Sequence, residues 1–67
     1  MNLKKERNME SNLRKIRVYS NATDDRLDYN KKYVFHHWID QRTALIECVE
    51  SGFLMEIFYD GNFNFEV

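Results

Sequence analysis

From Lys32 onward the sequence is almost continuous β signal, interrupted by glycine at only two positions. Segments rich in Val, Ile, Phe, Tyr and Thr cover residues 32–39, 42–50, 53–59 and 62–67. The chain has no proline, and Gly52 and Gly61 are its two glycines, so both positions predict turns. Upstream, residues 14–19 alternate apolar with charged side chains, which predicts a first strand. Turn-forming residues 20–25 predict a loop, and residues 26–32 are either a short strand or an extended connector.

The register of each hairpin follows from its faces, because a slip of one residue moves every side chain to the opposite face. A three-residue loop at 59–61, with Gly61 in the left-handed region, keeps one face apolar. Two-residue loops at 51–52 and 40–41 continue the same face into a four-stranded meander. The predicted pairs are Ile57 with Phe63, Ile46 with Ile57, Phe35 with Ile46 and His37 with Ala44. The predicted core face is Tyr33, Phe35, His37, Ala44, Ile46, Cys48, Phe53, Met55, Ile57, Phe63, Phe65 and Val67.

A short, strongly twisted meander must curl to bury one face, and Ile16 and Val18 of the first strand can help to close it. We therefore predict an all-β domain over residues 12–67, a small five-stranded SH3-like or OB-like partly open barrel. Residues 1–11 are polar and basic, and we expect a flexible or partly helical N-terminal arm. A chain of 67 residues is one domain at most, and it buries only about 60% of its unfolded surface.

The predicted outer face carries too much apolar surface for an idle solvent face. Apolar patches with a polar rim mark interaction sites, and aromatic side chains are enriched in their centres. The predicted partner-binding residues are Val34, His36, Trp38, Leu45, Glu47, Glu56, Phe58 and Glu66. Two alternatives stay open at this point: the arm covers this face through Leu3, Met9 and Leu13, or two copies of the chain pair through it.

The same registers place Glu47 opposite Glu56, and like charges directly opposed across strands are destabilising. Three interpretations follow, in order of preference. The two glutamates are solvated, or they form an acidic stripe for a basic partner. The third is an acid–base pair, which would require unequal pKa values and a concave pocket.

Other chemistry finds little support in the residue types. His36 and His37 are adjacent on a strand and should point to opposite faces, so they should not share a metal ion. Cys48 falls on the core face, where a thiol is inert. No serine lies between two glycines on a sharp turn, and no glycine-rich phosphate loop is present. We expect no enzymatic activity, no metal and no cofactor.

Charge and cysteine content bear on partners and compartment. The net charge is −1, but basic side chains gather in residues 1–17 and acidic ones dominate residues 18–67. A single cysteine suits a reducing compartment, so we expect a cytoplasmic protein with no signal peptide and no membrane span. Nucleic-acid binding through the arm, Arg17, Tyr19 and exposed aromatics is the second functional hypothesis, which the acidic body disfavours.

The motifs "YVFHHW", "TALIECVESG" and "MEIFYDGNFNF" resemble small SH3-like barrel proteins encoded by bacteriophages and prophages, mainly of Gram-positive bacteria. The likeness covers residues 31–67 and carries over no catalytic residue, and this chain departs in its second glycine turn and its basic arm. The resemblance implies a phage accessory protein that binds a host enzyme or a defence nuclease, as anti-CRISPR proteins do. We therefore expect a protein-interaction module that inhibits or modulates a bacterial host or defence protein by docking its aromatic and acidic surface on a basic one.

Overall fold

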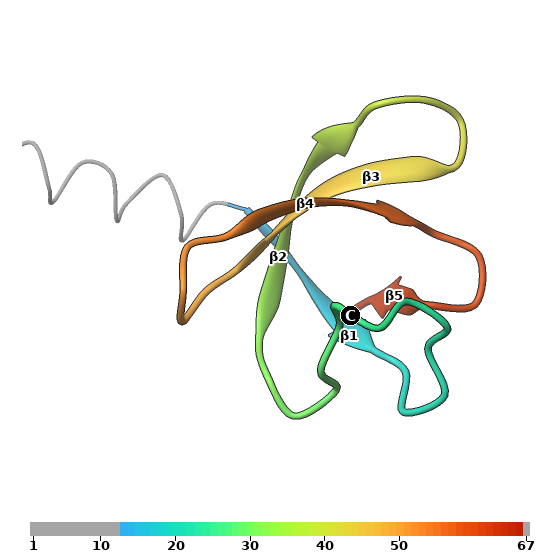
Figure 1. The fold of residues 1–67 in the computed structure, drawn as a ribbon. Coiled ribbons are helices and arrows are strands. Elements are labelled where there is room, and N and C mark those ends of the chain that lie inside the picture. Colours follow the sequence, from blue (N-terminus) through green and yellow to red (C-terminus); the bar gives the residue numbers. More distant parts are fainter. Residues whose placement is uncertain (1–12, 67) are drawn as a thin grey trace, which may run out of the picture.

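The computed structural model describes residues 13–66, which form one antiparallel sheet of five strands (Figure 1). The strands are β1 (Arg14–Val18), β2 (Tyr33–Trp38), β3 (Thr43–Cys48), β4 (Leu54–Phe58) and β5 (Phe63–Phe65). Each corresponds to a strand predicted from the sequence, and residues 26–32 form a connector. Within residues 13–66 no helix is long and apolar enough to span a membrane. The predicted arm, residues 1–11, lies outside the described residues.

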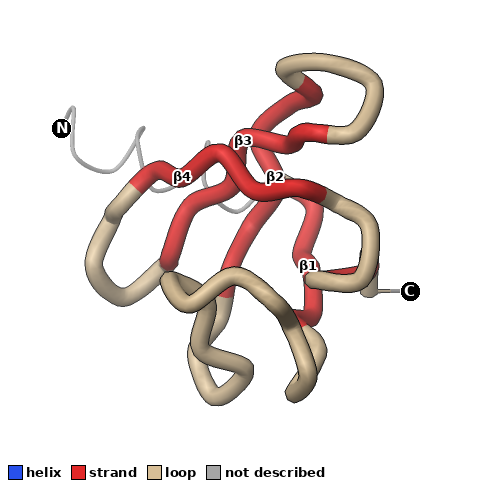
Figure 2. Tube along the Cα trace, turned by 45° about the vertical axis from the view of Figure 1, so that its right-hand side comes forward, coloured by secondary structure: helices blue, strands red, loops and turns tan. Residues whose placement is uncertain are grey.

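The strand order is β4-β3-β2-β1-β5, so the predicted four-stranded meander is wrong. Strands β2, β3 and β4 form a three-stranded meander (Figure 2), but β5 pairs with β1 instead of β4. Gly61 has a φ of 80°, the left-handed conformation that the sequence predicts. The chain nevertheless leaves β4 at this turn, because the Asn62 carbonyl accepts from the Tyr19 N–H of the segment after β1 (2.9 Å).

The β3–β4 hairpin has a four-residue loop where the sequence predicts two residues. The Cys48 N–H donates to the Phe53 carbonyl (2.9 Å), and Ile46 pairs with Met55 instead of Ile57. A shift of two residues keeps every side chain on its predicted face. It does change the neighbours: Glu47 lies opposite Leu54, and Glu56 lies opposite Leu45. The predicted opposition of Glu47 and Glu56 is therefore wrong.

The β2–β3 hairpin contains a β-bulge that the sequence analysis missed. Phe35 pairs with Ile46 as predicted, but beyond the bulge His37 pairs with Leu45 and Trp38 with Ala44. An extra residue on one strand reverses the alternation that follows it. His37 is therefore on the outer face and exposed, whereas Trp38 is on the inner face; both assignments reverse the prediction.

The core lies on the inner face and matches the prediction in large part. Its buried members are Ile16, Val18, Tyr33, Ala44, Ile46, Cys48, Ile57 and Phe63, with Ala22 and Leu27 of the β1–β2 connection packed against them. Burying a side chain the size of Ile46 or Phe63 contributes about 1.5–3 kcal/mol. Phe53, predicted inside, is 72% exposed because it lies before the first residue of β4, and Val67 lies outside the described residues.

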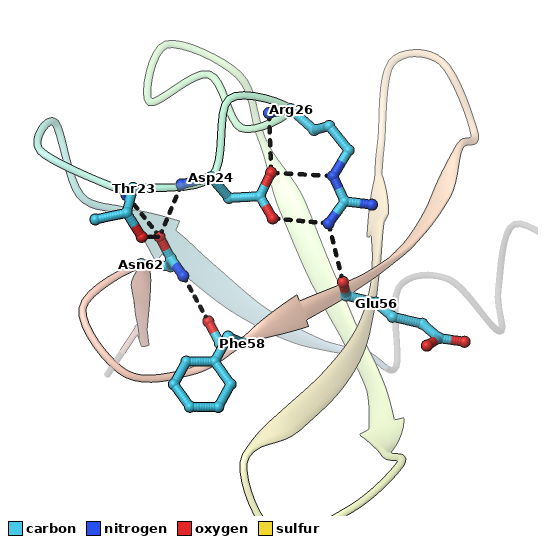
Figure 3. Close-up of polar contacts among 6 residues, drawn as sticks. All are labelled: Thr23, Asp24, Arg26, Glu56, Phe58 and Asn62. Atoms are coloured by element: carbon cyan, nitrogen blue, oxygen red, sulfur yellow. Dashed lines mark hydrogen bonds and ion pairs between the residues drawn. The ribbon is translucent and has the colours of Figure 1, made fainter.

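Side chains cover the edge of β4 that faces away from β3 (Figure 3). Asn62, only 2% exposed, donates its Nδ2–H to the Phe58 carbonyl (2.8 Å). Its Oδ1 accepts from the backbone N–H groups of Thr23 (2.8 Å) and Asp24 (3.2 Å). Arg26, held by two hydrogen bonds to the Asp24 carboxylate, donates to the Glu56 carbonyl (3.1 Å). These bonds protect a sheet edge that would otherwise offer unpaired carbonyls to another strand.

Candidate interaction surfaces

Of the eight residues predicted to bind a partner, all except Trp38 lie on the outer face of the sheet. Four of them share the outer face of two neighbouring strands: Leu45, Glu47, Glu56 and Phe58, and His36 contacts this group. Trp38 is on the inner face with the aromatic side chains. Val34 and Glu66 lie on the same outer face, where they line a groove beside this group, since Val34 pairs with Glu47. The predicted residues thus share one face of the sheet, apart from Trp38.

The outer surface of β3 and β4, which we call the β3–β4 face, alternates apolar and acidic side chains. It comprises Leu45, Glu47, Leu54, Glu56 and Phe58. Leu54 is 55% exposed and Phe58 44% exposed on a strand only five residues long. Leu54 was not among the predicted partner-binding residues, because the two-residue loop assumed there placed it beside Val49 and not beside Glu47.

His36 reaches the same face through the bulge. Its Nε2 lies 2.7 Å from Glu47 Oε1, and both side chains are largely shielded from solvent. Since His37 pairs with Leu45 on this face too, the two histidines are not separated by the pleat as predicted. No group of three or more His, Cys, Asp or Glu within residues 13–66 is arranged to hold a metal ion.

Trp38 belongs to an aromatic cluster formed by Phe35, Trp38, Tyr59, Phe63 and Phe65. Its ring centroid lies 5.3 Å from that of Phe35, 5.5 Å from Tyr59 and 6.1 Å from Phe65. The Arg14 guanidinium lies 4.2 Å from the Phe65 ring centroid, within the range of a cation–π interaction. Trp38 is still 43% exposed, so it both packs and presents one edge to solvent.

A groove of about 770 Å³ crosses the outer side of β1 and the start of β2. We call it the β1 groove, and its charged and aromatic lining is Lys15, Arg17, Tyr19, Tyr29, Lys31, Lys32, Tyr33 and Glu66. Val34 lies in it and is 6% exposed. A second hollow of about 410 Å³ shares Arg17, Tyr19 and Glu66 and extends toward β5.

The perturbed titratable groups within residues 13–66 have structural causes. The side-chain hydrogen bond from Arg26 holds the pKa of Asp24 below its usual range. Backbone hydrogen bonds from Arg42 and Thr43 lower the pKa of Asp40 in the β2–β3 loop. A hydrogen bond from Ser51 lowers the pKa of the Cys48 thiol, which is buried. These three groups are spread over two loops and the core, so they do not form one reactive centre.

Compared with protein-family models, curated proteins and solved structures, the chain matches none of them.

Proposed function

We propose that this chain is a small SH3-like, partly open barrel that acts by binding another protein through its β3–β4 face. Support for the barrel type comes from the single twisted sheet with order β4-β3-β2-β1-β5. The edge strands β4 and β5 do not pair through backbone hydrogen bonds. A side chain connects them instead, since Asn62, next to β5, donates a hydrogen bond to the Phe58 carbonyl of β4. A barrel whose first and last strands do not pair is described as partly open.

The observation that carries the proposal is the exposure of Leu54 and Phe58 on an edge strand, each next to an acidic residue. Leu54 lies opposite Glu47, and Glu56 lies between the two apolar side chains on β4. Large apolar side chains anchor interfaces when a partner desolvates them. Carboxylates between such anchors favour a partner with a basic surface, because complementary charge speeds encounter and excludes acidic competitors.

The partner proposed is a host or defence protein in the cytoplasm of a bacterium. Support comes from the resemblance to phage accessory barrels and from the acidic character of the face. A nucleic-acid-processing enzyme would suit it best, because its basic channel accepts negative charge, and occupying that channel would inhibit it. Binding without catalysis is sufficient for this role.

The test begins by isolating a partner from bacterial lysate with the tagged full-length chain and then purifying that partner. The Leu54→Ser/Phe58→Ser double variant should bind it at least about 30-fold more weakly, since truncating an interface anchor costs about 2 kcal/mol or more. Phe53→Ser is the matched control, because Phe53 is more exposed than either residue but precedes β4. Its affinity should stay within about threefold of wild type.

Two results would overturn the proposal. One is unchanged affinity in the double variant when its circular dichroism spectrum and melting point equal those of wild type. The other is a concentration-dependent dimer of the free chain in light scattering that the double variant abolishes, which would assign the face to a second copy.

A further inference from the structure

We propose that the β1 groove is a second binding site and that it takes a single-stranded nucleic acid. This site adjoins the β3–β4 face on the same side of the sheet, since Val34 pairs with both Lys15 and Glu47, but it does not rest on the function proposed for that face. Its volume of about 770 Å³ falls within the range of about 300–1,000 Å³ that is typical of ligand sites. Together with the hollow that shares Arg17, Tyr19 and Glu66, it forms a track across β1 toward β5.

The charge of the groove is opposite to that of the rest of the domain. Lys15 and Arg17 lie two residues apart on β1 and therefore project from the same face, about 7 Å apart. Lys31 and Lys32, which directly precede β2, line the same groove, and Glu66 is the only acidic residue in the lining. The acidic residues of 13–66 outside it are Asp24, Asp25, Asp28, Asp40, Glu47, Glu50, Glu56 and Asp60. This segregation lets a domain with an overall acidic charge attract phosphate at one place.

Aromatic and apolar side chains in the groove favour nucleotides over a simple anion. Tyr19 and Tyr29 are both exposed and line it. Val49, which is 41% exposed, adds apolar surface to the lining. Single strands bind where a positive groove follows the backbone and aromatic rings stack on the bases.

The backbone around these rings is held by hydrogen bonds. The Tyr19 N–H donates to the Asn62 carbonyl (2.9 Å), which fixes the start of the β1–β2 connection. Near Tyr29, the Tyr33 hydroxyl accepts from the Asp28 N–H (3.0 Å), and the Lys31 N–H donates to the Asp28 carbonyl (2.9 Å). A site held in this way loses less conformational entropy when it binds.

The test is fluorescence anisotropy of the full-length chain with labelled oligo-dT and oligo-U of about ten nucleotides. Affinity should fall with salt, with a log–log slope of about −0.7 for each phosphate neutralised. Four cations therefore give a slope near −3, or about a 50-fold loss between 50 and 200 mM salt. Lys15→Gln/Arg17→Gln should reduce the steepness of that slope by about 1.4. Tyr29→Ala should weaken binding about tenfold and leave the slope unchanged.

Matched variants separate the groove from other basic regions. Arg42→Gln removes a cation that lies beside Phe58 and does not line the groove, and it should leave affinity unchanged. Lys4→Gln/Lys5→Gln/Arg7→Gln neutralises the basic residues near the start of the chain, and the effects of the groove variants should persist in that background.

Four outcomes would overturn the proposal: no binding at micromolar protein and low salt, equal affinity for a poly-glutamate peptide, tighter binding of a duplex, or loss of all binding in the Lys4/Lys5/Arg7 variant. We expect a groove variant to bind the partner captured through the β3–β4 face as wild type does, but not the oligonucleotide. This result would show that the two binding functions use different residues.

Discussion

Replacing Asn62 with alanine should destabilise the domain more than any other single change of a polar side chain within residues 13–66. Asn62 is 2% exposed, and its amide joins the β1–β2 connection to β4 through Thr23, Asp24 and Phe58. Removing the amide leaves two N–H groups and one carbonyl without their partner. Each loss costs about 1–3 kcal/mol when water cannot enter.

Thr23 is exposed and Asp24 half-buried, so water will replace part of what the alanine variant loses. We therefore expect a loss of about 3 kcal/mol, near the low end of the range set by the three groups. A domain of this size has a total stability of about 3–10 kcal/mol. The loss is thus about 30% or more of the total stability.

Urea unfolding followed by Trp38 fluorescence measures the effect. With an m-value of about 1 kcal/mol/M, the midpoint should fall by about 3 M. Asn21→Ala, in an exposed turn of the same connection, is the control and should change stability by less than about 0.5 kcal/mol. A change below 1 kcal/mol in Asn62→Ala would refute the reasoning, because it would mean that Asn62 does not hold the connection to β4.

Three further predictions address the inner face, an ion pair and a turn. Trp38→Ala should cost about 2–3 kcal/mol in urea unfolding followed by circular dichroism, below the range for a fully buried tryptophan, because Trp38 packs in the aromatic cluster but is 43% exposed; Phe58→Ala on the outer face should cost less than about 1 kcal/mol, and equal costs would contradict the bulge. Because Arg26 lowers the pKa of Asp24, the pair stabilises the fold above the ordinary Asp pKa, and this contribution is lost as pH falls below about 4. Asp24→Asn should therefore show less loss of stability between pH 7 and pH 3 than wild type, and identical pH profiles would count against the pair. Gly61→Ala should cost about 1–2 kcal/mol because its φ is 80°, whereas Gly61→Asn should cost less since Asn tolerates this region; equal stability of the alanine variant and wild type would show that the turn has another conformation.

The strands could be predicted from the sequence because their signals are local. Alternation around Ile16 and the apolar residues of β2 to β5 identified all five strands. The faces of β3 and β4 were also correct, although their register was not, since the loop after Cys48 is longer by an even number of residues. Core residues such as Ile46 and Ile57 follow from those faces alone.

The pairing of β5 with β1 could not be read in the same way. A glycine turn between two β segments predicts a hairpin, and the Asp60-Gly61 turn separates β4 from β5 as such a turn would. The deciding contacts come from residues far apart in the sequence, Tyr19 with Asn62 and Lys15 with Glu66. A single sequence does not show which of two strands a terminal β segment will choose.

The candidate surfaces were predicted less well than the fold, and the bulge at His36 is one reason. One extra residue in β2 exchanged the faces of His37 and Trp38, which removed Trp38 from the expected patch. Arg17 and Tyr19 of the β1 groove belong to the nucleic-acid hypothesis drawn from the sequence, but its lysines do not, because Lys15 on β1 and the lysines before β2 are far apart in the sequence. Net charge over residues 18–67 hides such local segregation.

The most direct test of the two-surface interpretation is to measure the affinity of one purified partner, captured with the wild-type chain, for both surface variants by isothermal titration calorimetry. Leu54→Ser/Phe58→Ser should weaken binding by about 30-fold or more, while Lys15→Gln/Arg17→Gln should bind that partner as wild type does and lose only the oligonucleotide. Equal affinities of wild type and the Leu54/Phe58 variant for the partner, with both folded, would contradict the assignment of protein binding to the β3–β4 face.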